Sequence, residues 1–170
     1  MSMPNSPNTY GIQAISQPGK EQDLENFKAH MEFKTLGKRR FRSVDVPQIS
    51  DYPTDPEQIL IVDVGGSFGH DIIDFHAAFP NLPWKLVLQD LPATISAIAP
   101  DFPKDIQAQT HDFFTSQPVE HAKIYYLHMI LHDWPDDSCR KILSNIITLM
   151  KNGYSKILLS EIVIPDTNAN

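Results

Sequence analysis

The 170-residue sequence has little cysteine, little basic charge and no long apolar run. Its one cysteine, Cys139, excludes an internal disulfide framework and indicates a reduced thiol. A net charge of −7 and a pI near 5.4 argue against a nucleic-acid groove or an anionic membrane surface as a partner. We find neither a run long enough to span a bilayer nor a signal-peptide pattern. We therefore expect a cytoplasmic protein with no nucleic-acid or membrane partner.

What the sequence does contain is typical of a globular domain, with 41% hydrophobic and 21% charged residues. Residues 1–57 are expected to form a mobile N-terminus, a helix near 21–37 and a proline-containing linker. Thereafter strands are predicted near 59–64, 85–90, 105–110, 123–130 and 155–164, and helices near 70–79, 92–99 and 136–151. This alternation predicts an α/β fold with a doubly wound, mostly parallel sheet.

The last predicted helix has the clearest pattern in the chain. Apolar residues recur along it every three or four positions, which predicts one buried stripe: Cys139, Ile142, Leu143, Ile146, Ile147 and Met150.

Residues 60–69 form the most informative segment: an apolar run, an acidic residue, a glycine-rich turn and then a helical pattern. A strand, turn and helix in this order can bind a nucleotide-like cofactor at the carboxyl edge of a parallel sheet. Gly65 and Gly69 let the backbone turn sharply and approach a ligand closely. Serine and histidine replace two glycines that a dinucleotide fingerprint would need, and Asp63 suits a cationic ligand group better than a pyrophosphate. The alternative is a simple tight turn.

Two further segments end predicted strands at the same edge. Asp90 follows Gly69 at about the spacing of the acidic residue that binds ribose hydroxyls in a βαβ unit. The alternative is a helix cap or a solvated loop acid. Asp112 could hydrogen-bond an exocyclic amine and Phe113 could stack on an adenine, or they could form a turn with a core aromatic ring.

A pair of histidines marks the end of the fourth predicted strand. His132 lies just past its carboxyl end, where a histidine can take a proton from a substrate hydroxyl near neutral pH. The alternative is a histidine that caps a helix or packs in a loop. His128 lies within the strand and faces either the core or a cofactor. The spacing of these histidines and Asp133 matches no metal-ligand signature, so no metal is predicted.

Taken together, the segments over about residues 59–168 resemble S-adenosylmethionine-dependent O-methyltransferases of the plant and fungal small-molecule type. Five stretches carry the resemblance: Ile61-Val-Asp-Val-Gly-Gly, Leu88-Gln-Asp-Leu-Pro92, His111-Asp-Phe-Phe114, Leu131-His-Asp-Trp-Pro-Asp-Asp137 and Leu158-Leu-Ser-Glu-Ile-Val-Ile-Pro165. The resemblance implies a class I methyltransferase core, which is Rossmann-like, and O-methylation of a small-molecule phenol or enol in fungal secondary metabolism.

The resemblance also implies roles for individual residues. Seven would bind S-adenosylmethionine: Asp63, Gly65, Gly69, Asp90, Asp112, Phe113 and His128. His132 matches the general base that deprotonates the acceptor hydroxyl. Glu161 matches a carboxylate that orients that histidine, as a second group often fixes tautomer and direction.

Departures from the family pattern set the remaining expectations. Ser67 replaces the middle glycine. We also expect the family's N-terminal dimerisation and substrate-binding domain to be absent. We expect residues 58–170 to be a truncated catalytic core, incomplete at the C-terminus, whose open edge strand is covered by a homo-oligomer or a partner chain. The alternatives to an enzyme of this kind are a non-catalytic remnant or helper subunit, or a repurposed fold that catalyses a rearrangement.

Overall fold

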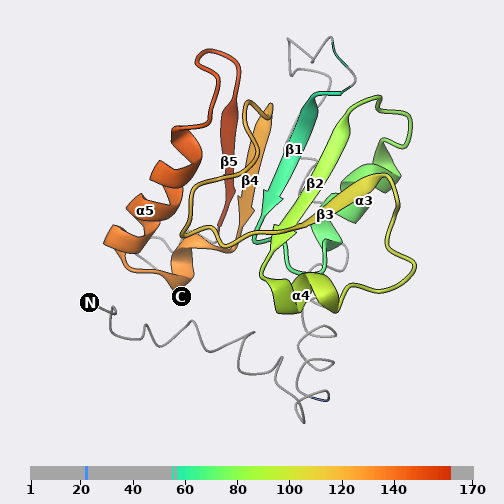
Figure 1. The fold of residues 1–170 in the computed structure, drawn as a ribbon, viewed down its shortest axis with the longest axis horizontal. Helices are drawn as coiled ribbons and strands as arrows, with labels where there is room; N and C mark the ends of the chain where they lie inside the picture. Colours follow the sequence, from blue (N-terminus) through green and yellow to red (C-terminus); the bar gives the residue numbers. More distant parts are fainter. Residues whose placement is uncertain (1–21, 23–54, 56, 162–170) are drawn as a thin grey trace, which may run out of the picture.

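The computed structural model describes residues 22, 55 and 57–161 (Figure 1). The helix expected near 21–37 lies outside the described residues, apart from residue 22, and so does the end of the strand expected at 155–164. Among the described residues, no helix combines the length and the apolarity that a bilayer crossing needs.

The described residues form one five-stranded sheet with helices in the connections. Along the chain the elements are β1 (Ile59–Val64), α3 (His70–Ala78), β2 (Lys85–Asp90), α4 (Pro92–Ser96), β3 (Ile106–Thr110), β4 (Ile124–His128), the 3-10 helix η3 (Leu131–Asp133), α5 (Asp136–Ile147) and β5 (Lys156–Ser160). The strand order is β3-β2-β1-β4-β5, and all four neighbouring pairs are parallel. The predicted α/β fold with a parallel sheet is therefore confirmed.

Two apolar clusters cover the two faces of the sheet. One joins the strands to α3 through Ile72 and Phe75. The other joins them to α5 through Ile142 and Ile146. Because β1 and β2 lie inside the sheet and are covered on both faces, they are apolar almost throughout, as a doubly wound sheet requires. Figure 1 shows α5 beside β4 and β5, with α3 and α4 on the side of β1, β2 and β3.

Element boundaries differ from the sequence expectations where local backbone geometry intervenes. The fourth strand ends at His128 and not near 130, because Met129 has a φ of 54° and turns the chain into η3. A positive φ cannot continue a strand. The last predicted helix ends at Ile147, and its apolar stripe is narrower than expected, because Ile147 is 55% exposed. Each residue turns a helix by 100°, so the neighbour of a buried residue points away from the core.

The two isoleucines of α5 give a matched test of this packing. Ile142 is fully buried, so Ile142→Ala should lower the free energy of unfolding by about 2–5 kcal/mol through lost burial and a cavity. Ile147→Ala removes the same atoms from an exposed site and should change it by less than about 0.5 kcal/mol. Urea denaturation monitored by circular dichroism measures both values. Equal losses would show that α5 packs on the sheet through a different face.

Candidate active site

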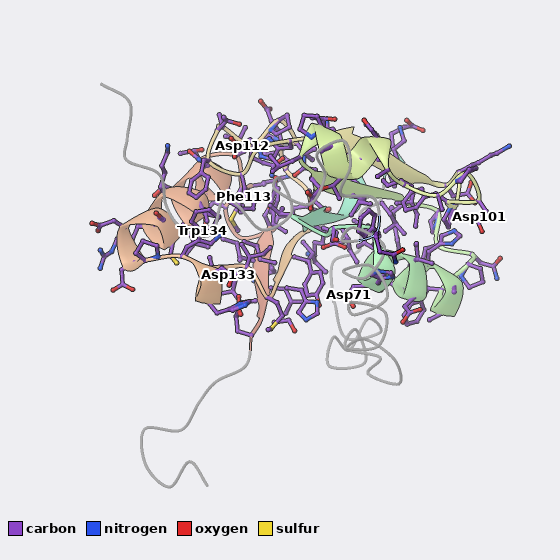
Figure 2. The ribbon with its side chains drawn as sticks, turned by 90° about the horizontal axis from the view of Figure 1, so that it is seen from below. Asp71, Asp101, Asp112, Phe113, Asp133 and Trp134 are labelled. Atoms are coloured by element: carbon purple, nitrogen blue, oxygen red, sulfur yellow. The ribbon has the colours of Figure 1, made fainter. Side chains whose placement is uncertain are left out.

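The carboxyl ends of the parallel strands bring the predicted site residues to one edge of the sheet. The strand order changes direction between β1 and β4, which is the switch point where open α/β sheets bind ligands. Figure 2 looks onto this edge and shows Asp71, Asp112, Phe113 and Asp133 distributed along it.

In the turn after β1, the glycine positions have no room for a Cβ atom. Gly65 has a φ of 70°, and a Cβ there would lie 2.8 Å from Cδ1 of Ile130 and 3.3 Å from the ring of Phe113. At Gly66 a Cβ would lie 2.5 Å from Oδ2 of Asp63, a clash that excludes any larger residue. Gly66 was not among the predicted site residues. Its lack of a side chain leaves space for the buried carboxyl group of Asp63, and only the packing in the structure shows this contact.

The turn is fastened to the end of β2. The backbone N–H groups of Gly65 and Gly66 donate to the carbonyl oxygen of Gln89, at 2.8 and 3.1 Å. The N–H of Ser67 donates to Oδ2 of Asp90 at 2.8 Å, and the N–H of Leu91 donates to Oδ1 at 2.7 Å. Each oxygen of Asp90 thus accepts one backbone bond, and the side chain of Thr94 interacts with the same carboxylate. A carboxylate has about four lone-pair sites, so Asp90 can still accept from a ligand hydroxyl. Burial raises the pKa of this carboxyl group.

Of the carboxyl groups at the site, that of Asp63 is the least favourable to ionise. Its side chain is 1% exposed, and its Oδ2 has no hydrogen-bond partner. Burial raises the pKa of Asp63 well above its ordinary value, and the nearby carboxylates of Asp71 and Asp90 raise it further. A cationic group bound at the turn would offset this cost. The orphaned carboxylate and the glycine cradle therefore fit a cofactor with a positive charge, as S-adenosylmethionine has.

The two residues expected beside an adenine lie in the loop after β3. Asp112 is exposed, and its Oδ1 accepts from the N–H of Phe114 at 2.9 Å, so it shapes a turn. The ring of Phe113 packs edge-on against Phe114 and Trp134, at 5.0 and 5.9 Å between centroids. The carbonyl of Phe113 accepts from Nδ2 of Asn145 at 3.0 Å, which fixes the loop to α5.

His132 and Glu161 are brought together from the ends of two neighbouring strands. Nδ1 of His132 lies 3.0 Å from Oε2 of Glu161. The other oxygen, Oε1, accepts from the N–H groups of Ile130 and Leu131 at 3.0 and 2.8 Å. Glu161 is 18% exposed and His132 is 41% exposed, so the carboxylate is held inside and the ring faces outward. Nε2 of His132 lies 3.4 Å from Oδ1 of Asp133.

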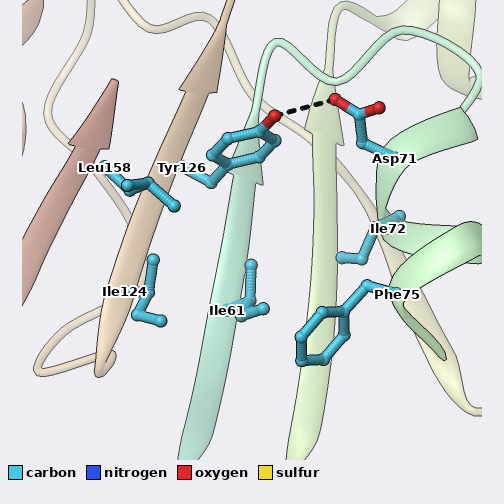
Figure 3. A pocket seen from close by; sticks show the side chains of 7 residues that line it. All are labelled: Ile61, Asp71, Ile72, Phe75, Ile124, Tyr126 and Leu158. Carbon is cyan, nitrogen blue, oxygen red and sulfur yellow. Dashed lines mark hydrogen bonds between the residues drawn. The ribbon is translucent and has the colours of Figure 1, made fainter. Parts of the chain in front are cut away.

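His128 belongs to a separate group on the face of the sheet that α3 covers. Its Nδ1 lies 2.5 Å from Oδ2 of Asp71. The hydroxyl of Tyr126 donates to the same oxygen at 2.9 Å (Figure 3). Asp71 and Tyr126 were not predicted as site residues, because 55 residues separate them and nothing local links them. The described residues contain no group of three or more side chains placed to hold a metal ion.

This fold and edge define a Rossmann-like, class I methyltransferase core. The chain matches a family model, the O-methyltransferase domain, over residues 13–170. It therefore belongs to the O-methyltransferase family, whose members depend on S-adenosylmethionine, as the sequence resemblance predicted.

Individual relatives agree with this assignment. The chain is 42% identical over 158 residues to the O-methyltransferase penC of Penicillium thymicola, covering 91% of this chain and 38% of that protein. It is 42% identical over 120 residues to the demethylsterigmatocystin 6-O-methyltransferase of Aspergillus flavus, covering 71% and 30%. The solved structure of LepI in complex with SAM superposes with a TM-score of 0.69 at 37% identity, covering 73% and 32%. The chain thus spans about a third of the length of these proteins, and it resembles enzymes of fungal secondary metabolism.

The buried carboxyl group of Asp63 predicts a pH-dependent effect. An aspartate whose pKa is raised on folding stabilises the fold below its unfolded pKa near 3.8, and this contribution is lost as the pH rises. Asp63→Asn removes the charge, so its stability relative to wild type should increase from pH 4.5 to pH 7.5. Urea denaturation at several pH values measures the difference. Asp74→Asn, at an exposed site on α3, is the matched control, and a pH-independent difference for Asp63→Asn would contradict the prediction.

Proposed function

We propose that this protein methylates a hydroxyl group of a small molecule, with a phenol or an enol as the acceptor. The observation that carries the proposal is the pairing of His132 with Glu161 at the edge that also holds the glycine turn. The family and the fungal relatives support methyl transfer from S-adenosylmethionine. The nature of the acceptor is inferred from the base, because a phenol or enol hydroxyl is acidic enough for a histidine to deprotonate.

In this proposal the cofactor is bound by residues of four chain segments. The turn at Gly65 and Gly69 accommodates its amino-acid part, with Asp63 as the nearby negative charge. Asp90 accepts from its ribose hydroxyls, as its available lone pairs allow. The loop of Asp112 and Phe113 flanks the adenine, and His128 lies beside the cofactor. When bound, S-adenosylmethionine supplies a methyl group that its sulfonium charge has already activated.

The protein's own part in the reaction is to move one proton. The carboxylate of Glu161 can only accept, so it holds the proton of His132 on Nδ1 and leaves Nε2 as the basic atom. Nε2 takes the proton of the acceptor hydroxyl as its oxygen becomes a nucleophile. The positive charge that then develops on the ring is stabilised by Glu161 and, at longer range, by Asp133.

Among the described residues, β5 is an edge strand of the sheet. It pairs only with β4 there, and its own residue Leu159 is 46% exposed. An exposed apolar edge strand is a site for strand pairing. We propose that a second copy or a partner chain covers it, and that the protein works in the cytoplasm.

The cofactor role of Asp90 can be tested by binding alone. Asp90→Ala should weaken S-adenosylmethionine and S-adenosylhomocysteine by about 1–3 kcal/mol, because ligand hydroxyls and the N–H of Ser67 lose their acceptor. Isothermal titration calorimetry measures both ligands. Asp105→Ala, at an exposed site before β3 on the opposite edge of the sheet, is the control and should bind normally. If folded wild type gave no heat with either ligand at millimolar concentration, the cofactor assignment would be wrong.

Catalysis should depend on the histidine and its partner. His132→Ala should lower the rate of methyl transfer by about 10²–10⁴ while cofactor affinity is unchanged, because a general base is lost. Glu161→Gln keeps the size but not the charge, and should lower the rate by a smaller factor. His76→Ala, on the far end of α3, is the control.

The assay follows labelled methyl from S-adenosylmethionine to a panel of phenolic polyketides, with and without candidate partner proteins. Equal rates for wild type and His132→Ala would remove this histidine from the mechanism. Cofactor binding without transfer to any acceptor would favour the non-catalytic helper, and conversion of a substrate without methyl transfer would favour the rearrangement.

A further inference from the structure

The group formed by Asp71, Tyr126 and His128 is separate from the pair of His132 and Glu161. Asp71 lies in the first turn of α3, two residues after Gly69, which is the N-cap of that helix. Tyr126 and His128 lie on β4, where His128 is the last residue and Tyr126 lies two residues before it, and η3 begins three residues after His128. The group therefore joins the cofactor turn directly to the strand that leads to His132.

One oxygen of Asp71 fixes both partners. Oδ2 accepts from the hydroxyl of Tyr126 at 2.9 Å and lies 2.5 Å from Nδ1 of His128. A carboxylate can only accept, so this contact places a proton on Nδ1 whether the ring is neutral or charged. The tautomer and the direction of His128 are thus both set by Asp71.

Tyr126 makes the arrangement rigid. Its ring stacks on that of His128, with 6.0 Å between centroids and 24° between planes. Burial and the charge of Asp71 raise the pKa of Tyr126, so its hydroxyl remains a donor throughout the physiological range. The side chains of Asp71 and His128 are only 16% and 11% exposed, so solvent competes little with these contacts.

The group lies between the buried carboxyl group of Asp63 and an apolar pocket. Tyr126 is the register partner of Asp63 on β1, and the charge of Asp71 adds to the cost of ionising Asp63. Below Asp71 and Tyr126 the pocket is apolar and is lined by Ile61, Ile72, Phe75, Ile124 and Leu158 (Figure 3). The polar atoms therefore sit only at the end that faces the cofactor edge.

We propose that Asp71 and Tyr126 are positioning residues: Asp71 holds His128 in one tautomer, both residues hold its ring in one direction, and they act on cofactor binding only through this histidine. The proposal rests on the proposed function, since it assumes that the cofactor binds at the glycine turn. It makes the start of α3 and the end of β4 a single unit, in which the turn that holds the cofactor and the strand that leads to the base move together.

A double-mutant cycle tests the dependence of Asp71 on His128. Asp71→Ala and His128→Ala should each weaken S-adenosylhomocysteine by about 10-fold, the scale of one charge-assisted contact. Because Asp71 acts through the ring, Asp71→Ala should cost nothing further in the His128→Ala background. Asp74→Ala, an exposed aspartate on the same helix, is the matched control. Losses that simply add would overturn the proposal.

A second measurement is independent of the cofactor. Nitrogen-15 NMR of the imidazole in the free, full chain should show the proton of His128 on Nδ1, and Asp71→Ala should abolish that preference. Tyr126→Phe, which removes one oxygen and keeps the ring, should leave the tautomer in place and weaken binding by a smaller factor than Asp71→Ala. Urea denaturation confirms that each variant folds.

Together, the binding and NMR measurements distinguish a failure of the proposed function from a failure of the positioning role. Wild-type protein that shows the Nδ1 tautomer but binds no S-adenosylhomocysteine would refute the proposed function and leave the positioning intact. Wild-type protein that binds the ligand while His128 carries its proton on Nε2 would refute the positioning alone.

Discussion

The attachment of the glycine turn to the end of β2 is the contact on which the rest of the site depends. Two backbone N–H groups of the turn bond to the carbonyl of Gln89, and the third bonds to the carboxylate of Asp90. These bonds fix where α3 starts and hence where Asp71 lies. Gln89 is itself fully buried and exchanges amide hydrogen bonds with Gln117 at 2.8 and 2.9 Å. The acid expected at a ribose, the glycine turn and the loop after β3 are therefore one hydrogen-bonded unit.

The charges at this edge are arranged at a cost in stability. Asp63, Asp71 and Asp90 lie close enough for the charges of the last two to raise the pKa of Asp63, and burial raises it most. A site selected for stability alone would not place a carboxylate with an unpartnered oxygen inside the sheet. Such an arrangement is typical of a functional site, and a ligand with a positive charge would complement these carboxyl groups. Of these carboxylates, Asp71 has contacts within the protein, with Nδ1 of His128 and the hydroxyl of Tyr126.

Much of the fold could be predicted from the sequence, because periodicity and glycine patterns are local. The strands at 59–64 and 85–90 were predicted with their observed bounds, since buried parallel strands are continuous apolar runs. The alternation of strands and helices also predicted the parallel sheet. The end of β4 was predicted two residues too late, because nothing in the residue type of Met129 announces a positive φ.

The site was only partly predictable for the same reason. Asp63, Gly65, Gly69 and Asp90 stand out in the sequence because each follows or precedes a strand end. The pairing of His132 with Glu161 was expected from the family resemblance, and spacing alone would not have indicated it. Asp71 and Tyr126 carried no signal, since their contact exists only once α3 has packed on the sheet. Gly66 was missed because its neighbour Asp63 fills the space that a Cβ would need.

The backbone at Met129 shows how the candidate base is placed. A residue other than glycine with a φ of 54° costs on the order of 1–3 kcal/mol, so the surrounding contacts must stabilise this conformation. The N–H of Met129 donates to the carbonyl of Ser160 at 2.9 Å, and the next two N–H groups converge on the carboxylate of Glu161. Hydrogen bonds to a charged group contribute about 1.5–3 kcal/mol each, which is enough to offset the strain. The turn that ends β4 and the carboxylate that follows β5 therefore stabilise each other. His132 takes its position from both, so the geometry of the base depends on the pairing of β4 with β5.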